Sequence, residues 1–346
     1  MFALILRRSF ALLTLTLLLG TGLASAQVTR TWVGGTNGLW NLAANWDPSG
    51  IPASIDHVII SGSGTVDLGG GAITVADMTL SNKTLSGTST MTTNGTFTWN
   101  SGTLMMAGGF DANGPISLES TTKYLSTTLD LNNTTTWSGG YVYMTDGAVL
   151  NNTAGQTMTA THEGGMYFVR SGAPFSVEPV FNNLGTFVKN TQDVNNNFTT
   201  VQGITGIQVV FNNTGSVEVN LGTPNPTNMT GTSELDLSFA GTSTGSFTVV
   251  ADAILSFDGN HTLNGVSISG AGEVDLSPTT NELISFTGAY TYNVTGTTRH
   301  SGGGTGRTLF NAGTVTSVGD VIHSGGQLDL QTGGTISPVT YEQSGG

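Results

Sequence analysis

The chain has 346 residues, of which 50 are Gly and 57 are Thr, while only 9 % are charged and none is Cys. Gly, Thr, Asn and Ser are poor in helix interiors, so this composition excludes a helical protein, and the lack of thiols excludes a disulfide scaffold and a Cys-ligated metal site. The formal charge of −13 makes nucleic-acid partners unfavourable, and a hydrophobic content of 37 % argues against disorder.

The first 26 residues have the features of an export signal. Arg7 and Arg8 precede the apolar stretch 11–20, which is too short to span a bilayer, and residues 24–26 (Ala-Ser-Ala) resemble a cleavage site. We expect a signal peptide over 1–26, no transmembrane segment after its cleavage, and a location outside the cell or on its outer surface. General secretion fits the strongly apolar core better than the twin-arginine route that the arginine pair suggests.

Residues 27–60 form a segment rich in tryptophan. Trp32, Trp40 and Trp46 lie within 15 residues of one another and lead into the apolar run 57–60. An array of repeats needs large side chains over its open apolar end, so we interpret this segment as an N-terminal cap. A platform for sugar rings is the alternative for these three indoles.

From residue 61 to 346 the chain is built of short alternating stretches separated by Gly, Asn or Ser. Apolar residues occupy every second position in 64–70, 95–106, 215–222 and 326–334. This period of two is typical of half-buried strands, and no window supports a long helical pattern.

Internal repeats indicate how these strands are arranged. The sequences VLNN, VFNN and VFNN place Leu150, Phe181 and Phe211 about 30 residues apart, and 309–318 reads as a later copy. A unit this short cannot bury its own apolar face, but it can when stacked on its neighbours. The pattern therefore predicts a parallel β-helix of about a dozen coils, with asparagine amides bonded between coils. Tandem β-sandwich domains are the alternative, although they would repeat every 90 to 100 residues or so.

The motif W-x-G-G-x-N-G-x-W-x-x-x-x-N-W from Trp32 to Trp46, followed by Pro52, Asp56 and 58–60 (Val-Ile-Ile), resembles the opening of exported bacterial β-strand-repeat proteins. The F-N-N-x-G repeats are similar to those of the same group, which resembles autotransporter passengers and filamentous-haemagglutinin-type β-helices. The resemblance implies a right-handed β-helix on the cell surface or secreted, adhesive or structural. Because the sequence stops in mid-pattern, we expect the repeat region to be truncated or covered by partner chains.

Acidic residues supply the nearest approach to a catalytic or cation-binding constellation. Glu234 and Asp236 share one face of a strand about 7 Å apart, as do Glu273 and Asp275. Such a pair can serve as acid and base or hold a cation, but recurrence in several coils is more typical of a solvated outer face. The histidines are far apart and show no metal-ligand spacing. We expect no cofactor, with Ca²⁺ at outward aspartates as the alternative.

Trp99 and Trp137 lie in strands beside Thr and Ser, and outward placement would make them ligand-binding platforms. No catalytic constellation emerges from the sequence. We therefore expect a secreted or cell-surface structural or adhesive solenoid that binds glycans or neighbouring surface proteins by extended polar contact. The alternatives are a carbohydrate-active β-helix enzyme, either a polysaccharide lyase or a glycoside hydrolase, and an inert spacer fragment of a larger surface protein.

Overall fold

The computed structural model describes residues 26–119, 121–161, 166–170, 176–190, 203–221, 233–311, 313–330 and 336–345. The expected signal peptide lies outside these ranges, apart from its last residue. Among the described residues, no helix is long and apolar enough to cross a membrane.

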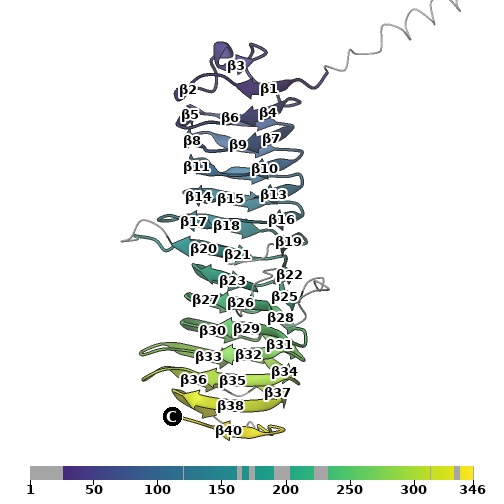
Figure 1. Cartoon of the computed structure of the whole chain (residues 1–346), viewed down its shortest axis with the longest axis vertical. Coiled ribbons are helices and arrows are strands. Elements are labelled where there is room, and N and C mark those ends of the chain that lie inside the picture. Colours follow the sequence, from purple (N-terminus) through teal and green to yellow (C-terminus); the bar gives the residue numbers. More distant parts are fainter. Residues whose placement is uncertain are drawn as a thin grey trace, which may run out of the picture.

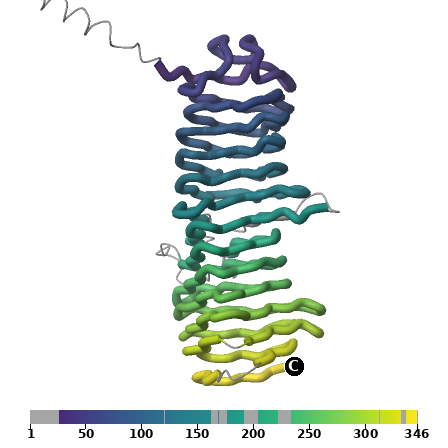
Figure 2. Tube along the Cα trace, turned by 180° about the vertical axis from the view of Figure 1, so that it is seen from behind, coloured from purple at the N-terminus to yellow at the C-terminus, as the bar shows by residue number. Residues whose placement is uncertain are grey.

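The chain winds into an elongated column of stacked coils (Figures 1 and 2). Each coil contributes a short strand to three sheets that run the length of the column, and strands of successive coils pair in parallel. This is a parallel β-solenoid with 12 strands in its smallest sheet, as the repeats predict. Parallel pairing excludes the tandem β-sandwich alternative, whose sheets are antiparallel.

The three sheets are called A, B and C, and the only helix described is the 3₁₀ turn η1 (Ala43–Asn45). Sheet A contains, in spatial order, β3 (Trp46–Asp47), β1 (Thr29–Trp32), β4 (His57–Ile60), β7 (Asp77–Leu80), β10 (Phe97–Trp99), β13 (Ile116–Leu118), β16 (Thr135–Trp137), β19 (Thr157–Ala160), β22 (Thr186–Asn190), β25 (Ser216–Asn220), β28 (Ser246–Val249), β31 (Ser267–Gly270), β34 (Thr291–Val294) and β37 (Thr314–Ser317). Sheet B contains β2 (Asn37–Leu39), β5 (Thr65–Asp67), β8 (Lys83–Gly87), β11 (Gly102–Met106), β14 (Lys123–Leu125), β17 (Val142–Met144), β20 (Met166–Arg170), β23 (Gly203–Gln208), β26 (Ser233–Leu237), β29 (Ala253–Phe257), β32 (Glu273–Leu276), β35 (Thr297–Ser301), β38 (Asp320–Gly325) and β40 (Tyr341–Gln343). Sheet C contains β6 (Ala72–Val75), β9 (Thr90–Thr93), β12 (Phe110–Ala112), β15 (Thr128–Leu131), β18 (Val149–Asn152), β21 (Val180–Asn183), β24 (Val210–Asn213), β27 (Ala240–Ser243), β30 (Asn260–Asn264), β33 (Leu283–Thr287), β36 (Arg307–Phe310) and β39 (Gln327–Leu330).

The core is a continuous column of inward side chains. Residues at alternate strand positions are buried, and the same position is apolar in coil after coil, as in the series Leu129, Leu150, Phe181 and Phe211 of sheet C. Rings of successive coils contact each other directly, with centroids 5.2 Å apart for Phe181 and Phe211. The alternation in the sequence therefore predicts the inward set correctly, because each strand has only two faces.

The repeated Asn-Asn pair places one amide on each face of sheet C. The second Asn points inward, and Asn152, Asn183 and Asn213 are each 0 % exposed. The Asn152 Nδ2 donates to the Asn183 Oδ1 at 2.7 Å, and the Asn183 Nδ2 donates to the Asn213 Oδ1 at 2.9 Å. The predicted amide bonding between coils is confirmed, and it satisfies polar groups that would otherwise be costly to bury.

The fourth copy of the repeat, 309–318, does not share this register. Phe310 pairs with Phe286 in the preceding coil. In the coils before that, the same position is held by Leu263, Ser243 and Asn213, and not by Phe211. Thr308 occupies the Phe211 position instead. The prediction of a fourth equivalent copy is wrong by two residues, a shift that keeps Phe310 inward because the face of a strand repeats every two positions.

The three tryptophans of the N-terminal segment pack together at the first coil. Trp46 meets both neighbours edge to face, with ring centroids 5.1 Å from Trp32 and 4.8 Å from Trp40, and all three are at most 5 % exposed. A Cβ on Gly34 would lie 2.6 Å from the Trp32 ring and from the Asn45 side chain, so the backbone approach requires glycine there. The spaced Trp, Gly and Asn of this motif thus pack together at the end of the core, where β1 and β3 form the first coil of the column (Figure 1).

Candidate functional site

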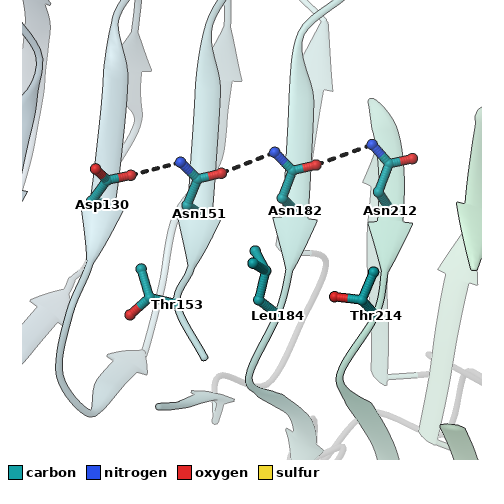
Figure 3. A pocket seen from close by; sticks show the side chains of 7 residues that line it. All are labelled: Asp130, Asn151, Thr153, Asn182, Leu184, Asn212 and Thr214. Atoms are coloured by element: carbon teal, nitrogen blue, oxygen red, sulfur yellow. Dashed lines mark hydrogen bonds between the residues drawn. The ribbon is translucent and has the colours of Figure 1, made fainter. Parts of the chain in front are cut away.

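A groove runs along the outer face of sheet C across four coils. It has a volume of about 370 Å³, and Figure 3 shows the side chains that line it. Its upper row is a ladder of side-chain hydrogen bonds, and its lower row is formed by Thr153, Leu184 and Thr214. We call it the ladder groove, and its lining residues are Asp130, Asn151, Thr153, Asn182, Leu184, Asn212 and Thr214.

The ladder is directional. The Asn151 Nδ2 donates to the Asp130 carboxylate at 2.6 Å, Asn182 donates to Asn151 at 2.9 Å, and Asn212 donates to Asn182 at 3.0 Å (Figure 3). Each amide nitrogen has two N–H groups and each amide oxygen two lone pairs. One donor and one acceptor therefore remain at Asn151 and at Asn182, whereas the Asn212 Oδ1 already accepts from the Thr242 backbone N–H and hydroxyl and keeps only a free donor beside it. Rungs repeat about every 4.8 Å. This arrangement suits an uncharged polymer with regularly spaced hydroxyl or amide groups.

A second groove lies at the corner where sheet A turns into sheet B, and we call it the corner groove. It has a volume of about 540 Å³ and spans four coils. Hydroxyl, amide and backbone groups form most of its wall, and an aromatic ring is part of it. Its lining residues are Ser63, Gly64, Asn82, Lys83, Thr84, Ser101, Gly102, Thr103, Thr121, Thr122 and Tyr124.

Buried lysines hold this corner together from the inside. Lys83 is 2 % exposed, and its Nζ donates to the backbone carbonyls of Gly35, Thr36 and Ser63. Lys123 is 0 % exposed and donates in the same way to the carbonyls of residues 119, 121 and 139. Burial lowers the pKa of Lys123 to about 8. Each ammonium group thereby satisfies carbonyls of two successive turns, so the corner groove has a positive charge beneath it but no ammonium group in it.

Gly102 lies between these two lysines in the register of sheet B. Its φ is +98°, and a Cβ there would lie 2.3 Å from the Lys83 carbonyl oxygen. Only glycine fits this left-handed position, because the Lys83 backbone packs directly against it.

Tyrosines continue the corner groove toward the next coil. Tyr124 is 41 % exposed, and its ring stacks on Tyr143 with centroids 5.3 Å apart and planes inclined by 19°. Tyr141, 38 % exposed, lies 6.1 Å from Tyr143. Thr103, Tyr124 and Tyr143 occupy one outward row in three successive coils. One face of the Tyr124 ring is therefore covered by Tyr143, and the other is turned toward Thr103 and the groove.

The four acids named from the sequence lie on the outer face of sheet B. Glu234 and Asp236 of β26 point outward while Leu235 and Leu237 are buried, and Glu273 and Asp275 do the same two coils further on. Burial, reinforced by the neighbouring carboxylates, raises the pKa of Glu234 to about 7. Burial likewise raises the pKa of Asp236 to about 6.

The two distal acids of this face have partners in the next coil. The Arg299 Nε donates to the Glu273 Oε1 at 2.6 Å and its Nη2 to the Oε2 at 3.2 Å, while the Ser301 hydroxyl donates to the Asp275 Oδ1 at 2.8 Å. None of the four carboxylates lines the ladder groove or the corner groove. Within the described ranges, no three His, Cys, Asp or Glu residues are grouped as metal ligands, so the Ca²⁺ alternative gains no support.

A third lysine lies behind the acidic face. Lys189 of β22 is 0 % exposed, and its Nζ has no hydrogen-bond partner among the described residues. Burial lowers the pKa of Lys189 to about 7, although the attraction of Glu234 opposes this shift. An inward ammonium group without an acceptor is unusual, because desolvating a charge without compensation is costly.

The ligand-binding role predicted for Trp99 and Trp137 does not fit the structure. Both indoles are 0 % exposed, and both residues occupy the same inward position, which Leu118 fills in the coil between them. The Trp137 ring packs 4.4 Å from Phe168. The alternation around them explains this placement, since Trp99 has the same parity as the buried Phe97. They are core residues and have no face free to stack on a sugar.

The surface tyrosines and the buried lysines were missed by sequence reasoning, although a signal for them exists. In Lys123-Tyr124-Leu125 the alternation that buries Leu125 also turns Lys123 inward and Tyr124 outward. Comparison of the chain with protein-family models, curated proteins and solved structures finds no match. The observations that bear on function are therefore the two grooves and the acidic face.

Proposed function

We propose that this protein is an exported structural or adhesive solenoid that binds a glycan or a surface protein by extended polar contact. Residues 1–26 would direct export, and the chain would belong with the exported β-strand-repeat proteins, which resemble autotransporter passengers and filamentous haemagglutinins. The stiff column holds its outer faces in a fixed arrangement, and such preorganisation reduces the entropy lost on binding.

The ladder groove carries this proposal. It presents amides and hydroxyls at the step of the solenoid, with Leu184 (44 % exposed) as an apolar contact in the middle. Many weak contacts repeated along a rigid surface add up to affinity when they engage together. Its single charged lining residue, Asp130, lies at one end, so a neutral ligand suits the rest of the groove.

The test is binding of the chain without residues 1–26 to a glycan array and to immobilised surface proteins. The variant Asn182→Ala removes the middle rung of the ladder, and Thr262→Ala, an exposed position in the same row of sheet C, is the matched control. We expect weaker binding by Asn182→Ala and unchanged binding by Thr262→Ala. Wild-type protein that binds neither class of partner would leave the inert-spacer alternative in place.

The raised pKa values of Glu234 and Asp236 favour a second candidate, a carbohydrate-active enzyme. A carboxyl group that is protonated near neutrality can act as a general acid. Alternate positions of a strand lie about 7 Å apart, within the spacing of the carboxyl pair in inverting glycosidases. A reducing-sugar assay on soluble polysaccharides tests this candidate, with Glu234→Gln and Asp236→Asn as variants and Glu218→Gln, an outward acid of sheet A, as the control. Turnover that survives both substitutions rules out this pair as its source.

A further inference from the structure

We propose that the corner groove is a binding site for a neutral oligosaccharide, with the Tyr124 ring as its stacking platform. This inference rests on the part of the proposed function that concerns glycans. It adds the place where a glycan binds and the chemical class of that glycan. It concerns a different part of the surface from the ladder groove, since the two share no lining residue.

The wall of the corner groove matches the chemistry of a sugar. Hydroxyl groups of Thr84, Thr103 and Ser101 and the amide of Asn82 are short donors and acceptors of the kind that pair with sugar hydroxyls. The backbone N–H of Asn82 donates to the Ser101 Oγ at 2.8 Å, which fixes that hydroxyl in place. A site of this volume is of the size that binds small ligands, and a few placed polar groups then set the orientation of the ligand.

The aromatic component is directional. Because Tyr143 covers one face of the Tyr124 ring, the exposed face is the one turned toward the coil of Thr103. A pyranose standing on Thr103 would place its apolar C–H face against this ring while its hydroxyls reach the polar wall.

Charge decides between neutral and charged sugars. Lys83 is the one basic side chain in the lining. It is buried, and its ammonium group already donates to three backbone carbonyls. Without an exposed ammonium or guanidinium group in this lining, uronic acids and sulfated sugars would meet no counter-charge, and the acidic surface repels them. A neutral chain such as a gluco-, xylo- or N-acetylglucosamine oligomer is therefore the ligand class that fits.

The test is titration of the chain without residues 1–26 with neutral oligosaccharides of two to six units, measured by calorimetry and by ligand-observed NMR. A heparin oligosaccharide serves as the charged comparison. We expect Tyr124→Ala to weaken binding of the neutral ligand about tenfold, which is the order expected for losing an aromatic contact. Tyr124→Phe keeps the ring and should bind within about twofold of wild type. Tyr341→Ala, which removes another exposed tyrosine at the far end of sheet B, is the matched control and should not change binding.

Each outcome has a distinct meaning. If Tyr124→Ala leaves the binding of the neutral oligosaccharide unchanged, the corner groove is not the binding site, but the proposed function still stands. Weaker binding by Asn182→Ala would then place the site on sheet C. Preference for heparin also overturns the inference. If wild type binds no neutral oligosaccharide but binds a surface protein, the inference fails alone, and if it binds neither, both proposals fail. Saturation transfer from the Tyr124 ring of the wild-type protein to the sugar gives a readout that does not depend on the folding of any variant.

Discussion

The two amides of one Asn-Asn pair offer a controlled measurement of what a buried ladder contributes. Asn182 and Asn183 are neighbours in β21 and carry the same side chain, but Asn183 faces the core and Asn182 faces solvent. Replacing either by Ala removes the same atoms from the same strand. The difference in unfolding free energy between the two variants therefore reports the combined effect of burial and of the one additional hydrogen bond that Asn183 makes.

The magnitude follows from the bonds at each site. Asn183 accepts from Asn152 at 2.7 Å and donates to the Asn213 Oδ1 and the Ser216 carbonyl, both at 2.9 Å. Each bond contributes about 1 kcal/mol net, and the Asn213 Oδ1 loses its donor inside the core, so Asn183→Ala should cost about 3 to 4 kcal/mol. Asn182 makes two side-chain bonds where water can replace them, so Asn182→Ala should cost less than about 1 kcal/mol.

Urea denaturation followed by far-ultraviolet circular dichroism measures the two costs. Solenoids can unfold in parts, so hydrogen exchange of the amides in β18, β21 and β24 should accompany the denaturation curves and locate the weakened coils. Asn183→Leu fills the same space but restores no hydrogen bond, and we expect it to be no more stable than Asn183→Ala. If Asn182→Ala and Asn183→Ala lose equal stability, the reasoning that burial gives this ladder its strength is wrong.

Three further substitutions test the charged groups. Lys189→Met should raise the unfolding free energy at pH 6 by about 2 to 3 kcal/mol, because it removes a buried ammonium group that has no hydrogen-bond partner in the described part of the chain. The folded pKa of Lys189, about 7, lies below its unfolded value, so the stability of the wild type should rise from pH 7 to 10 and that of the variant should not. Glu234→Gln should abolish a loss of stability that wild type shows between about pH 4.5 and 7, since a raised acid pKa means that the folded state holds the proton longer; equal pH profiles for both proteins would contradict this. Asp56→Ala should cost about 2 to 3 kcal/mol, because Asp56 is 2 % exposed and accepts from Arg30 at 2.7 Å and from two backbone N–H groups. Burial alone would raise the pKa of Asp56, but these hydrogen bonds lower it, so the stability that Asp56 contributes should be lost only in acid. An unchanged melting temperature for Asp56→Ala at pH 7 would contradict this stabilising role.

The sequence alone was sufficient for the class of fold and for the face of each strand. Alternation with a period of two has a single physical meaning in a strand, so the sequence by itself places Leu235 and Leu237 inward and their acidic neighbours outward. The same rule applied to the aromatic residues would have placed Trp99 inward and Tyr124 outward. The wrong expectation for Trp99 and Trp137 came from weighing their polar neighbours above their parity.

The register and the partners of the buried charges were decided only by the tertiary structure. Whether 309–318 repeats the Phe211 frame depends on how many residues each turn contains, and a change of two leaves the alternation intact, so the pattern cannot detect it. Alternation can turn Lys83, Lys123 and Lys189 inward, but which carbonyls or carboxylates lie near their ammonium groups depends on the neighbouring coils. Both grooves likewise arise from side chains of several coils, far apart in the sequence and adjacent only because the coils stack.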